Sequence, residues 1–229
     1  MKNLLVTLLF AAQSVFVFSQ DAEAILAKVV AKINSVKDYS VDANIKADIP
    51  LIKILPVKAT IYFKQKDKFK VVSKGIAILP KQGFTDMNTF LTKKSSYMVV
   101  ESGTKMIGDV KTTQVTVIPT NENSEFVLAK LWIDTEKDLI LKSQITTRGS
   151  GTVAVEYVYG DQAAFGLPSQ INFVVDVKKF KLPKSVAADL HDTDKKEKTE
   201  KEKKSGTIVI KLTNYKVNKG ISDDVFNKK

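Results

Sequence analysis

The residue types that most often carry enzyme chemistry are scarce in this chain of 229 residues. It has no cysteine and a single histidine, His191, which lies in a strongly charged stretch. A mobile surface histidine in such a stretch is a poor base for a catalytic triad, and no second histidine or any cysteine is present for a zinc site. Asp134 and Asp138 flank a predicted hairpin turn, and turn formation explains them better than glycoside hydrolysis does. The sequence therefore predicts a protein that is not an enzyme and that needs no metal or cofactor.

The charge pattern argues against nucleic-acid binding. The formal net charge is +11, but the cations are 35 lysines and one arginine, Arg148, spread along the whole chain. Specific base recognition and bidentate phosphate binding depend mainly on arginine. We therefore interpret the lysines as solvated strand faces, with a weak attraction to anionic lipid head groups or lipopolysaccharide as the alternative.

One amphipathic helix is predicted near the start of the chain, from Ala22 to Val36. Its apolar residues recur at three- and four-residue steps, and Asp21 is a natural N-cap. A helix of about four turns cannot bury such a stripe by itself. We therefore expect it to pack on a sheet.

Alternation of apolar and polar residues predicts roughly ten antiparallel strands. The clearest alternation runs from Tyr39 to Ile49, and further runs follow at hairpin spacing, with turns expected at Ser102-Gly103 and from Thr135 to Asp138. Because the strands have one apolar face, the helix should lie on the concave face of a curved sheet. The predicted fold class is mainly β with helical cover (α+β): a strongly curved antiparallel sheet with an N-terminal helix.

Two segments interrupt the strand pattern. Pro50 and Pro56 bracket a connection whose apolar residues are either buried under the core or exposed to a membrane or partner: Leu51, Ile52, Ile54 and Leu55. Between Ile76 and Leu91 the spacing becomes helical, which predicts a second short helical segment that could plug the mouth of the sheet.

Two segments of the chain are predicted to lie outside the folded core: the N-terminal residues and a charged loop. Residues 1–19 are predicted to be a signal peptide cleaved near Ser19, since the apolar run from Leu4 to Ala12 is short for a membrane span. Residues 189–204 carry six acidic residues against six lysines, which predicts a solvated, disordered loop. Residues 20–229 are therefore expected to form a single domain that is soluble after cleavage.

A curved sheet without reactive groups is typical of a container. Where its interior exceeds what its own side chains fill, the cavity is apolar and suits acyl chains or apolar segments of a partner, although the same residues could also pack a solid core. The candidate cavity and lid residues lie on the helix stripe, the first strands and the second helical segment: Ile25, Val29, Ile33, Val41, Ile45, Ile61, Phe63, Phe69, Val71, Phe84, Met87 and Phe90.

Several short motifs, each weak alone, occur in an order that resembles the LolA-like outer-membrane lipoprotein carrier proteins of the LolA/LolB-like superfamily. These motifs are Asp21 to Leu26, Val36 to Tyr39, Leu131 to Asp134, Leu167-Pro168 before Ile171-Asn172-Phe173, and Tyr215 to Ile221 followed by Val225-Phe226. The resemblance implies an unclosed β-barrel with a helical lid, whose cavity holds lipoprotein acyl chains in transit across the periplasm. The best-known carriers latch the lid with an arginine in the strand after the first helix, where this sequence offers only Lys46.

Two classes of function stay open. The first is a periplasmic carrier of lipid or lipoprotein acyl chains, a monomer that exchanges cargo with membrane-bound donor and acceptor proteins. The second is a non-enzymatic envelope sensor or protein-binding module of the same fold, acting through a sheet edge or the apolar segment from Pro50 to Pro56.

Overall fold

The computed structural model describes residues 22–50, 55–66, 68–75, 90–149, 151–176 and 205–227. Several predictions fall outside these ranges. They are the signal peptide, the charged loop with His191, the bulk of the second helical segment with Phe84 and Met87, and the contact candidates Leu51, Ile52 and Ile54.

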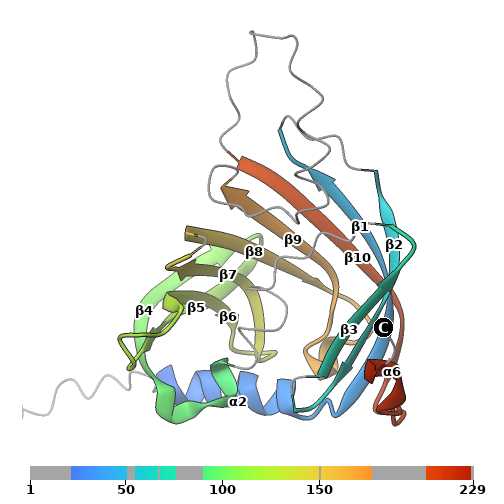
Figure 1. The fold of residues 1–229 in the computed structure, drawn as a ribbon. Coiled ribbons are helices and arrows are strands. Elements are labelled where there is room, and N and C mark those ends of the chain that lie inside the picture. Colours follow the sequence, from blue (N-terminus) through green and yellow to red (C-terminus); the bar gives the residue numbers. More distant parts are fainter. Residues whose placement is uncertain are drawn as a thin grey trace, which may run out of the picture.

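Ten antiparallel strands form one sheet that is not closed into a barrel (Figure 1). The strands are β1 (Asp38–Asp48), β2 (Val57–Lys64), β3 (Lys68–Ser73), β4 (Tyr97–Ile107), β5 (Val110–Pro119), β6 (Phe126–Asp134), β7 (Leu139–Thr147), β8 (Gly151–Tyr159), β9 (Pro168–Asp176) and β10 (Ser205–Val217). Their order is β3-β2-β1-β10-β9-β8-β7-β6-β5-β4, so β3 and β4 are the two edges and the first and last strands pair in the interior. The predicted fold class is confirmed.

The sheet is curved and keeps its apolar side chains on the concave face. In β1 the buried residues Val41, Ala43 and Ile45 alternate with exposed polar residues, as the sequence pattern predicts. The same alternation in the other strands builds one continuous core, in which Ile61 and Phe173 are among the fully buried side chains. The hydrophobic core of the described residues therefore lies on the concave side of the sheet.

Helix α2 (Ala22–Asn34) lies across one end of the curve and covers the concave face there (Figure 1). Ile25, Leu26 and Val29 are buried in the core, whereas Ile33 near the end of the helix is only partly buried. The helix contacts β4 and the 3-10 helix η3 (Ala163–Phe165). Glu23 in its first turn pairs with Lys94 just before β4, and Lys32 in its last turn lies against Gly166 next to η3. None of the helices in the described ranges is long and apolar enough to cross a membrane.

Three polar contacts tie α2 to segments that flank the strands, namely the residues before β4, the turn from β6 to β7 and the turn from β2 to β3. Glu23 forms an ion pair of 3.2 Å with Lys94, and the ammonium of Lys32 donates a hydrogen bond to the carbonyl of Lys137. At the helix end, the amide of Gln65 donates to the carbonyl of Asn34 at 2.8 Å, which satisfies one of the carbonyls that a helix end leaves unpaired. Lys46 lies on the exposed face of β1 and so does not act as a latch for the helix.

The hairpin turn predicted at Ser102-Gly103 is wrong. Strand β4 continues through these residues, and the turn comes later, between Ile107 and Val110. The register shifts between Glu101 and Thr104, so that two residues oppose one in β5, and Gly103 adopts a φ of 94°. A serine-glycine pair supplies the same backbone freedom to a bulge as to a turn, and this is why the sequence signal was ambiguous.

The described part of the second helical segment is its end. Residues 90–92 are helical, and a 3-10 helix η2 (Lys94–Ser96) follows. Phe90 stacks on Phe126 with ring centroids 5.0 Å apart and tilts against Tyr97 at 5.3 Å. The chain therefore enters β4 through an aromatic contact with the core.

Candidate functional site

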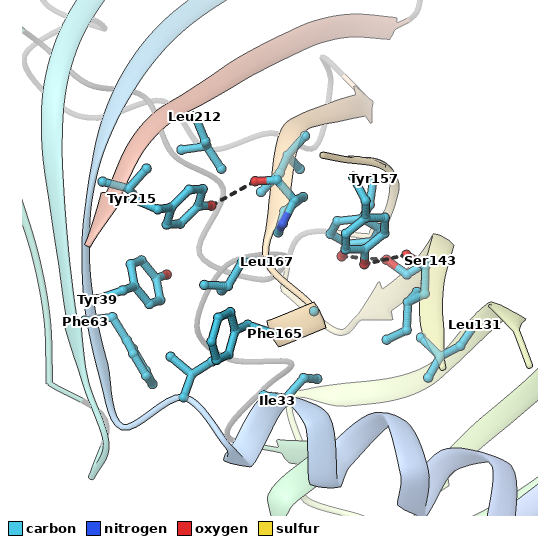
Figure 2. Close-up of a pocket in the computed structure, with 17 residues that line it drawn as sticks. Ile33, Tyr39, Phe63, Leu131, Ser143, Tyr157, Phe165, Leu167, Leu212 and Tyr215 are labelled. Carbon is cyan, nitrogen blue, oxygen red and sulfur yellow. Dashed lines mark hydrogen bonds between the residues drawn. The ribbon is translucent and has the colours of Figure 1, made fainter. Parts of the chain in front are cut away.

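An apolar pocket opens on the concave face beside the end of α2 (Figure 2). It holds about 880 Å³ of space not occupied by atoms, a figure that includes its opening to solvent. The part of this space that a water molecule can occupy is only about 90 Å³. The pocket as it stands is therefore smaller than the roughly 300–1,000 Å³ that is usual for small-molecule sites. The described residues that line it are Ile33, Val36, Tyr39, Val41, Phe63, Leu131, Ile140, Ser143, Tyr157, Tyr159, Phe165, Gly166, Leu167, Pro168, Ile171, Leu212 and Tyr215.

The pocket has two walls and a helical end. Figure 2 shows Tyr39, Phe63 and Tyr215 on the side of β1, β2 and β10, with Ser143 and Tyr157 on the opposite side. The end of α2 and the segment from η3 to β9 lie between these two walls and line the pocket there. A ligand in this pocket would therefore touch both arms of the curved sheet and the helix.

Tyrosines dominate the polar chemistry of the pocket, since four of the six in the chain line it. The hydroxyl of Tyr159 donates to the carbonyl of Ile140 and that of Tyr215 to the carbonyl of Pro168, both at 2.8 Å. The hydroxyl of Tyr157 lies 3.2 Å from that of Ser143. Burial raises the pKa of each of these tyrosines, so their hydroxyls stay neutral at any physiological pH.

A bulge in β10 directs Tyr215 into the pocket. Before the bulge the even-numbered residues of β10, such as Ile210 and Leu212, face the core. Ser40 then pairs with Lys216, whereas Asp42 pairs with Thr213, so two residues of β10 oppose one of β1. The extra residue reverses the alternation and turns Tyr215 inward.

Asn214 supplies the backbone conformation that this bulge requires. Its φ is 57°, in the left-handed region that asparagine tolerates better than most residues, and its side chain donates to Asp42 at 3.0 Å. The rings of Tyr215 and Tyr39 then meet in an edge-to-face arrangement, with ring centroids 5.8 Å apart. One irregular residue on the outer face thus positions an aromatic side chain on the inner face.

The segment from η3 to β9 depends on Gly166. This glycine has a φ of 67° and ends η3, with its N–H donating to the carbonyl of Ala163 at 2.9 Å. A Cβ atom there would lie 3.5 Å from the side chain of Lys32, so the aliphatic part of this lysine covers the glycine. Helix α2 and the segment that carries Phe165 and Leu167 are therefore in direct contact at the pocket.

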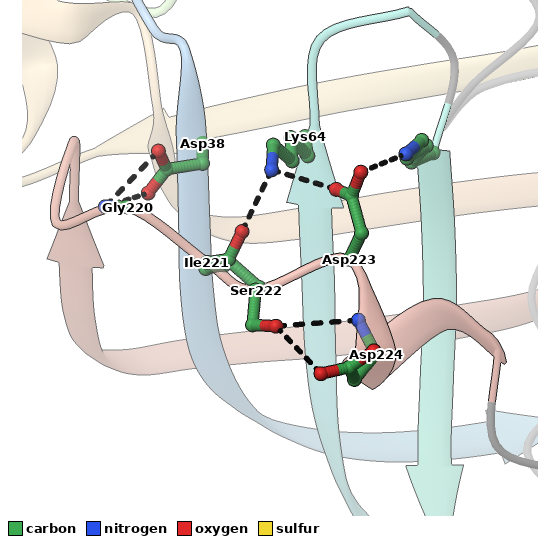
Figure 3. Close-up of polar contacts among 8 residues, drawn as sticks. Asp38, Lys64, Gly220, Ile221, Ser222, Asp223 and Asp224 are labelled. Carbon is green, nitrogen blue, oxygen red and sulfur yellow. Dashed lines mark hydrogen bonds and ion pairs between the residues drawn. The ribbon is translucent and has the colours of Figure 1, made fainter.

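The turn after β10 holds the start of β1, just before Tyr39. The buried carboxylate of Asp38 accepts hydrogen bonds at 3.0 Å from the N–H group of Lys219 and from that of Gly220, the latter shown in Figure 3. The side chain of Asn218 accepts from the N–H of Lys37 at 2.7 Å and donates to the carbonyl of Ser35 at 3.2 Å. The link between α2 and β1 is thus fixed by the far end of the chain.

The chain end is in turn held by an ion-pair cluster on β2 and β3. Asp223 lies 2.7 Å from both Lys64 and Lys68, and Lys64 also donates to the carbonyl of Ile221 (Figure 3). Hydrogen bonds from Lys64 and Lys68 lower the pKa of Asp223 to about 2. The short helix α6 (Asp224–Asn227) follows and packs near β3.

No metal chemistry is evident in the part of the chain that the structure describes. No group of three or more histidine, cysteine, aspartate or glutamate side chains there could hold an ion. Among the described residues that line the pocket, none carries a charged side chain at neutral pH. The pocket offers apolar surface and neutral hydroxyl groups.

The predicted site residues divide into three groups. Ile33, Val41 and Phe63 line the pocket. The others that are described belong to the core: Ile25, Val29, Ile45 and Ile61 are buried in it, and Phe69, Val71 and Phe90 pack against it partly buried. Leu55, the described contact candidate, has 74% of its surface exposed, and its contact with a membrane or partner stays a prediction.

The sequence argument missed the tyrosines and the segment from Phe165 to Pro168. Tyr39 begins the clearest alternating strand, on the same face as Val41, so it could have been included. Tyr215 could not, because the bulge that turns it inward is invisible in a regular alternation. Phe165 and Leu167 lie outside regular strands, where the hydrophobic pattern does not say which way a side chain points.

Comparison with known families gives one partial match. A family model of the MucB/RseB N-terminal domain matches residues 57–165, which are 109 of the 229 residues. No curated protein sequence matches the chain.

Comparison with solved structures is informative about the fold. An outer membrane lipoprotein-sorting protein domain, so named, from Vibrio parahaemolyticus is similar with a TM-score of 0.59 at 8% identity, covering 90% of this chain and 97% of that one. The LolA superfamily protein NE2245 from Nitrosomonas europaea gives 0.58 at 12% identity, with coverage of 90% and 97%. A DUF1329 family protein from Desulfovibrio piger gives 0.56 at 11% identity, with coverage of 90% and 96%. The chain therefore has a LolA-like fold.

Proposed function

We propose that this protein is a non-enzymatic periplasmic carrier, exported by a cleaved signal peptide, which shelters lipid or lipoprotein acyl chains in the pocket beside α2. The observation that carries the proposal is a pocket under an amphipathic helix whose described lining residues are uncharged and largely aromatic and aliphatic. The fold shared with a domain named for outer membrane lipoprotein sorting supports the same cargo class.

The energetics of the pocket suit an acyl chain. Each methylene transferred from water into such surroundings contributes roughly 0.8 kcal/mol, so a short stretch of chain gives measurable affinity. Helix α2 acts as the lid in this proposal, because its buried first turns anchor it while Ile33 at its far end faces the pocket. Loading then requires movement of the helix end rather than release of the whole helix.

Binding of an apolar probe tests the carrier proposal. The exported protein is purified, delipidated and titrated with an environment-sensitive apolar dye. Ile33→Glu places a charge in the pocket and is expected to weaken dye binding at least tenfold, whereas Ala31→Glu on the exposed side of α2 should leave it unchanged. Equal affinity for both variants, or no dye binding by the parent protein, would count against the proposal.

A second candidate function, a protein-binding module, is favoured by one specific observation. Strand β4 is an edge of the described sheet, and its Met98 and Val100 side chains are 56% and 50% exposed. An apolar edge strand can accept an extended segment of another protein by continuing the sheet. Val100→Lys should abolish crosslinking to a protein partner in cells if this function operates, and lipid should then be absent from the purified protein.

A further inference from the structure

One hydroxyl in the pocket differs from the others. Among the described residues, the hydroxyl of Tyr39 has no hydrogen-bond partner, whereas those of Tyr157, Tyr159 and Tyr215 each have one. Figure 2 shows the Tyr39 oxygen directed into the pocket. The hydroxyl is not fully enclosed, since among the described residues only Nε1 of Trp132 is a buried side-chain polar atom without a hydrogen-bond partner. A ligand that covers the Tyr39 hydroxyl would displace water from it, so a ligand that supplies a hydrogen-bond acceptor there should bind better than one that does not.

The ring of Tyr39 is held in place by its neighbours rather than by its hydroxyl. It stacks on Phe63 with ring centroids 5.2 Å apart and 24° between planes, and it meets the ring of Tyr215 in an edge-to-face arrangement. Its backbone pairs with Phe63 on β2 and with Val217 on β10. The hydroxyl is therefore presented at a fixed place without needing a protein partner.

The charge of the pocket limits which ligand can use this hydroxyl. Burial alone raises the pKa of Tyr39, which shows that the surroundings disfavour a negative charge. No lysine, arginine or histidine is among the described lining residues, so nothing there would offset a buried carboxylate. The group that meets Tyr39 should be a neutral hydrogen-bond acceptor.

We propose that Tyr39 is a specificity-determining residue, whose hydroxyl donates to the carbonyl of a neutral acyl ester or amide and so selects such chains over free fatty acids. This inference rests on the proposed carrier function and names its ligand class. The hydrocarbon part of the ligand lies against the apolar walls, and the carbonyl reaches the hydroxyl of Tyr39, for which the described lining of the pocket supplies no hydrogen-bond partner.

The test compares three ligands that share a twelve-carbon chain but differ in the polar group: methyl laurate, laurate and dodecane. Each competes with a bound apolar dye at pH 8, where laurate is ionised. The parent protein is expected to bind methyl laurate at least about tenfold more tightly than laurate, since a carboxylate would be buried without a counter-charge. Laurate binding as tight as methyl laurate would overturn the proposal.

Two variants distinguish the contribution of the Tyr39 hydroxyl to ligand affinity from the contribution of its ring. Tyr39→Phe should weaken methyl laurate roughly three- to tenfold, the value of one hydrogen bond, and leave dodecane unchanged. Tyr62→Phe makes the same chemical change on the opposite face of β2 and should alter neither ligand. Equal loss of both ligands in Tyr39→Phe, or no loss of either, would contradict the role of the hydroxyl.

The outcomes keep the two proposals apart. If dye, methyl laurate and dodecane all fail to bind the parent protein, the carrier function itself fails. If all three bind but neither the charge of the ligand nor Tyr39→Phe matters, only the selection by Tyr39 is wrong.

Discussion

At the scale of single residues, two positions on one helical stripe separate the core from the pocket. Val29 is buried in the core and does not line the pocket, whereas Ile33, four residues later, is partly buried and does. Both side chains looked equivalent in the sequence, because a stripe with helical spacing does not reveal what lies opposite each of its turns. In the structure Val29 contributes to the core, and Ile33 contributes to the wall of the pocket.

Truncating these two side chains should therefore have different consequences. Val29→Ala is expected to lower the free energy of unfolding by about 1 to 3 kcal/mol, through lost burial and a residual cavity, with little change in the affinity of an apolar probe. Ile33→Ala should weaken probe binding more than it lowers stability. Thermal denaturation and probe titration on both variants provide the comparison, and a reversal of this order would place the pocket elsewhere.

The tyrosines show what sequence reasoning could and could not reach. Tyr39 shares the inward face of β1 with Val41, so the alternation of that strand was enough to predict its direction. The inward direction of Tyr215 depends on a bulge, and the left-handed conformation of Asn214 that permits it has no signal in hydrophobic alternation. Side-chain direction after an irregularity requires the register, which only the structure supplies.

At the scale of elements, regular strands and the helix were predictable because each has a period that matches its burial. The strand pattern from Tyr39 to Ile49 and the stripe of α2 both appear as expected. Which strands pair with each other was harder to predict from the sequence. Nothing local in the sequence says that β1 pairs with β10, since the partners are separated by most of the chain.

The bulge in β10 should be sensitive to the residue that forms it. Asn214→Val places a β-branched residue at a φ of 57° and is expected to lower stability by about 1 to 2 kcal/mol and to weaken probe binding by displacing Tyr215. Asn214→Gly keeps the conformation and loses only an exposed hydrogen bond to Asp42, so it should behave nearly as the parent. Melting temperature and probe affinity measure both effects, and equal behaviour of the two variants would argue against this role for the bulge.

The attachment of the chain end should depend on acid. Because Lys64 and Lys68 lower the pKa of Asp223 to about 2, its stabilising effect is present above the usual carboxyl pKa near 4 and is lost as the pH falls towards 2. Hydrogen exchange should show residues 221–227 losing protection across this interval before the sheet does.

Two variants identify the group responsible for this acid transition. Asp223→Asn should remove the transition by loosening the segment already at neutral pH. Asp224→Asn changes a neighbouring carboxylate that contacts Ser222 and should retain the transition. If Asp223→Asn retained it too, another group would be responsible.

At the scale of the whole molecule, the pocket joins both arms of the curved sheet through neutral aromatic groups. Tyr39 and Tyr215 belong to the interior strands β1 and β10, and Tyr157 and Tyr159 belong to β8. All four are packed where ionisation is disfavoured, so their protonation is coupled to the integrity of the sheet as a whole.

This coupling predicts alkaline unfolding with a definite sign. In the unfolded chain the tyrosines ionise near their ordinary pKa of 10.0, whereas burial raises the pKa of all four in the folded protein. Above pH 10 the folded state therefore binds more protons than the unfolded state, and stability falls as the pH rises. Tyrosinate absorbance should then rise together with the loss of near-ultraviolet circular dichroism.

A neutral acyl ligand should shift this alkaline transition upward, because a ligand that binds only the folded state stabilises it in proportion to the logarithm of its concentration over Kd. Methyl laurate at saturation is expected to raise the midpoint, and Tyr39→Phe should reduce the shift at equal ligand concentration. Gradual ionisation of the four tyrosines with circular dichroism retained would mean that the pocket opens to water without unfolding. In that case a bound ligand would not keep water away from the hydroxyl of Tyr39, and a ligand carbonyl would add little to the affinity.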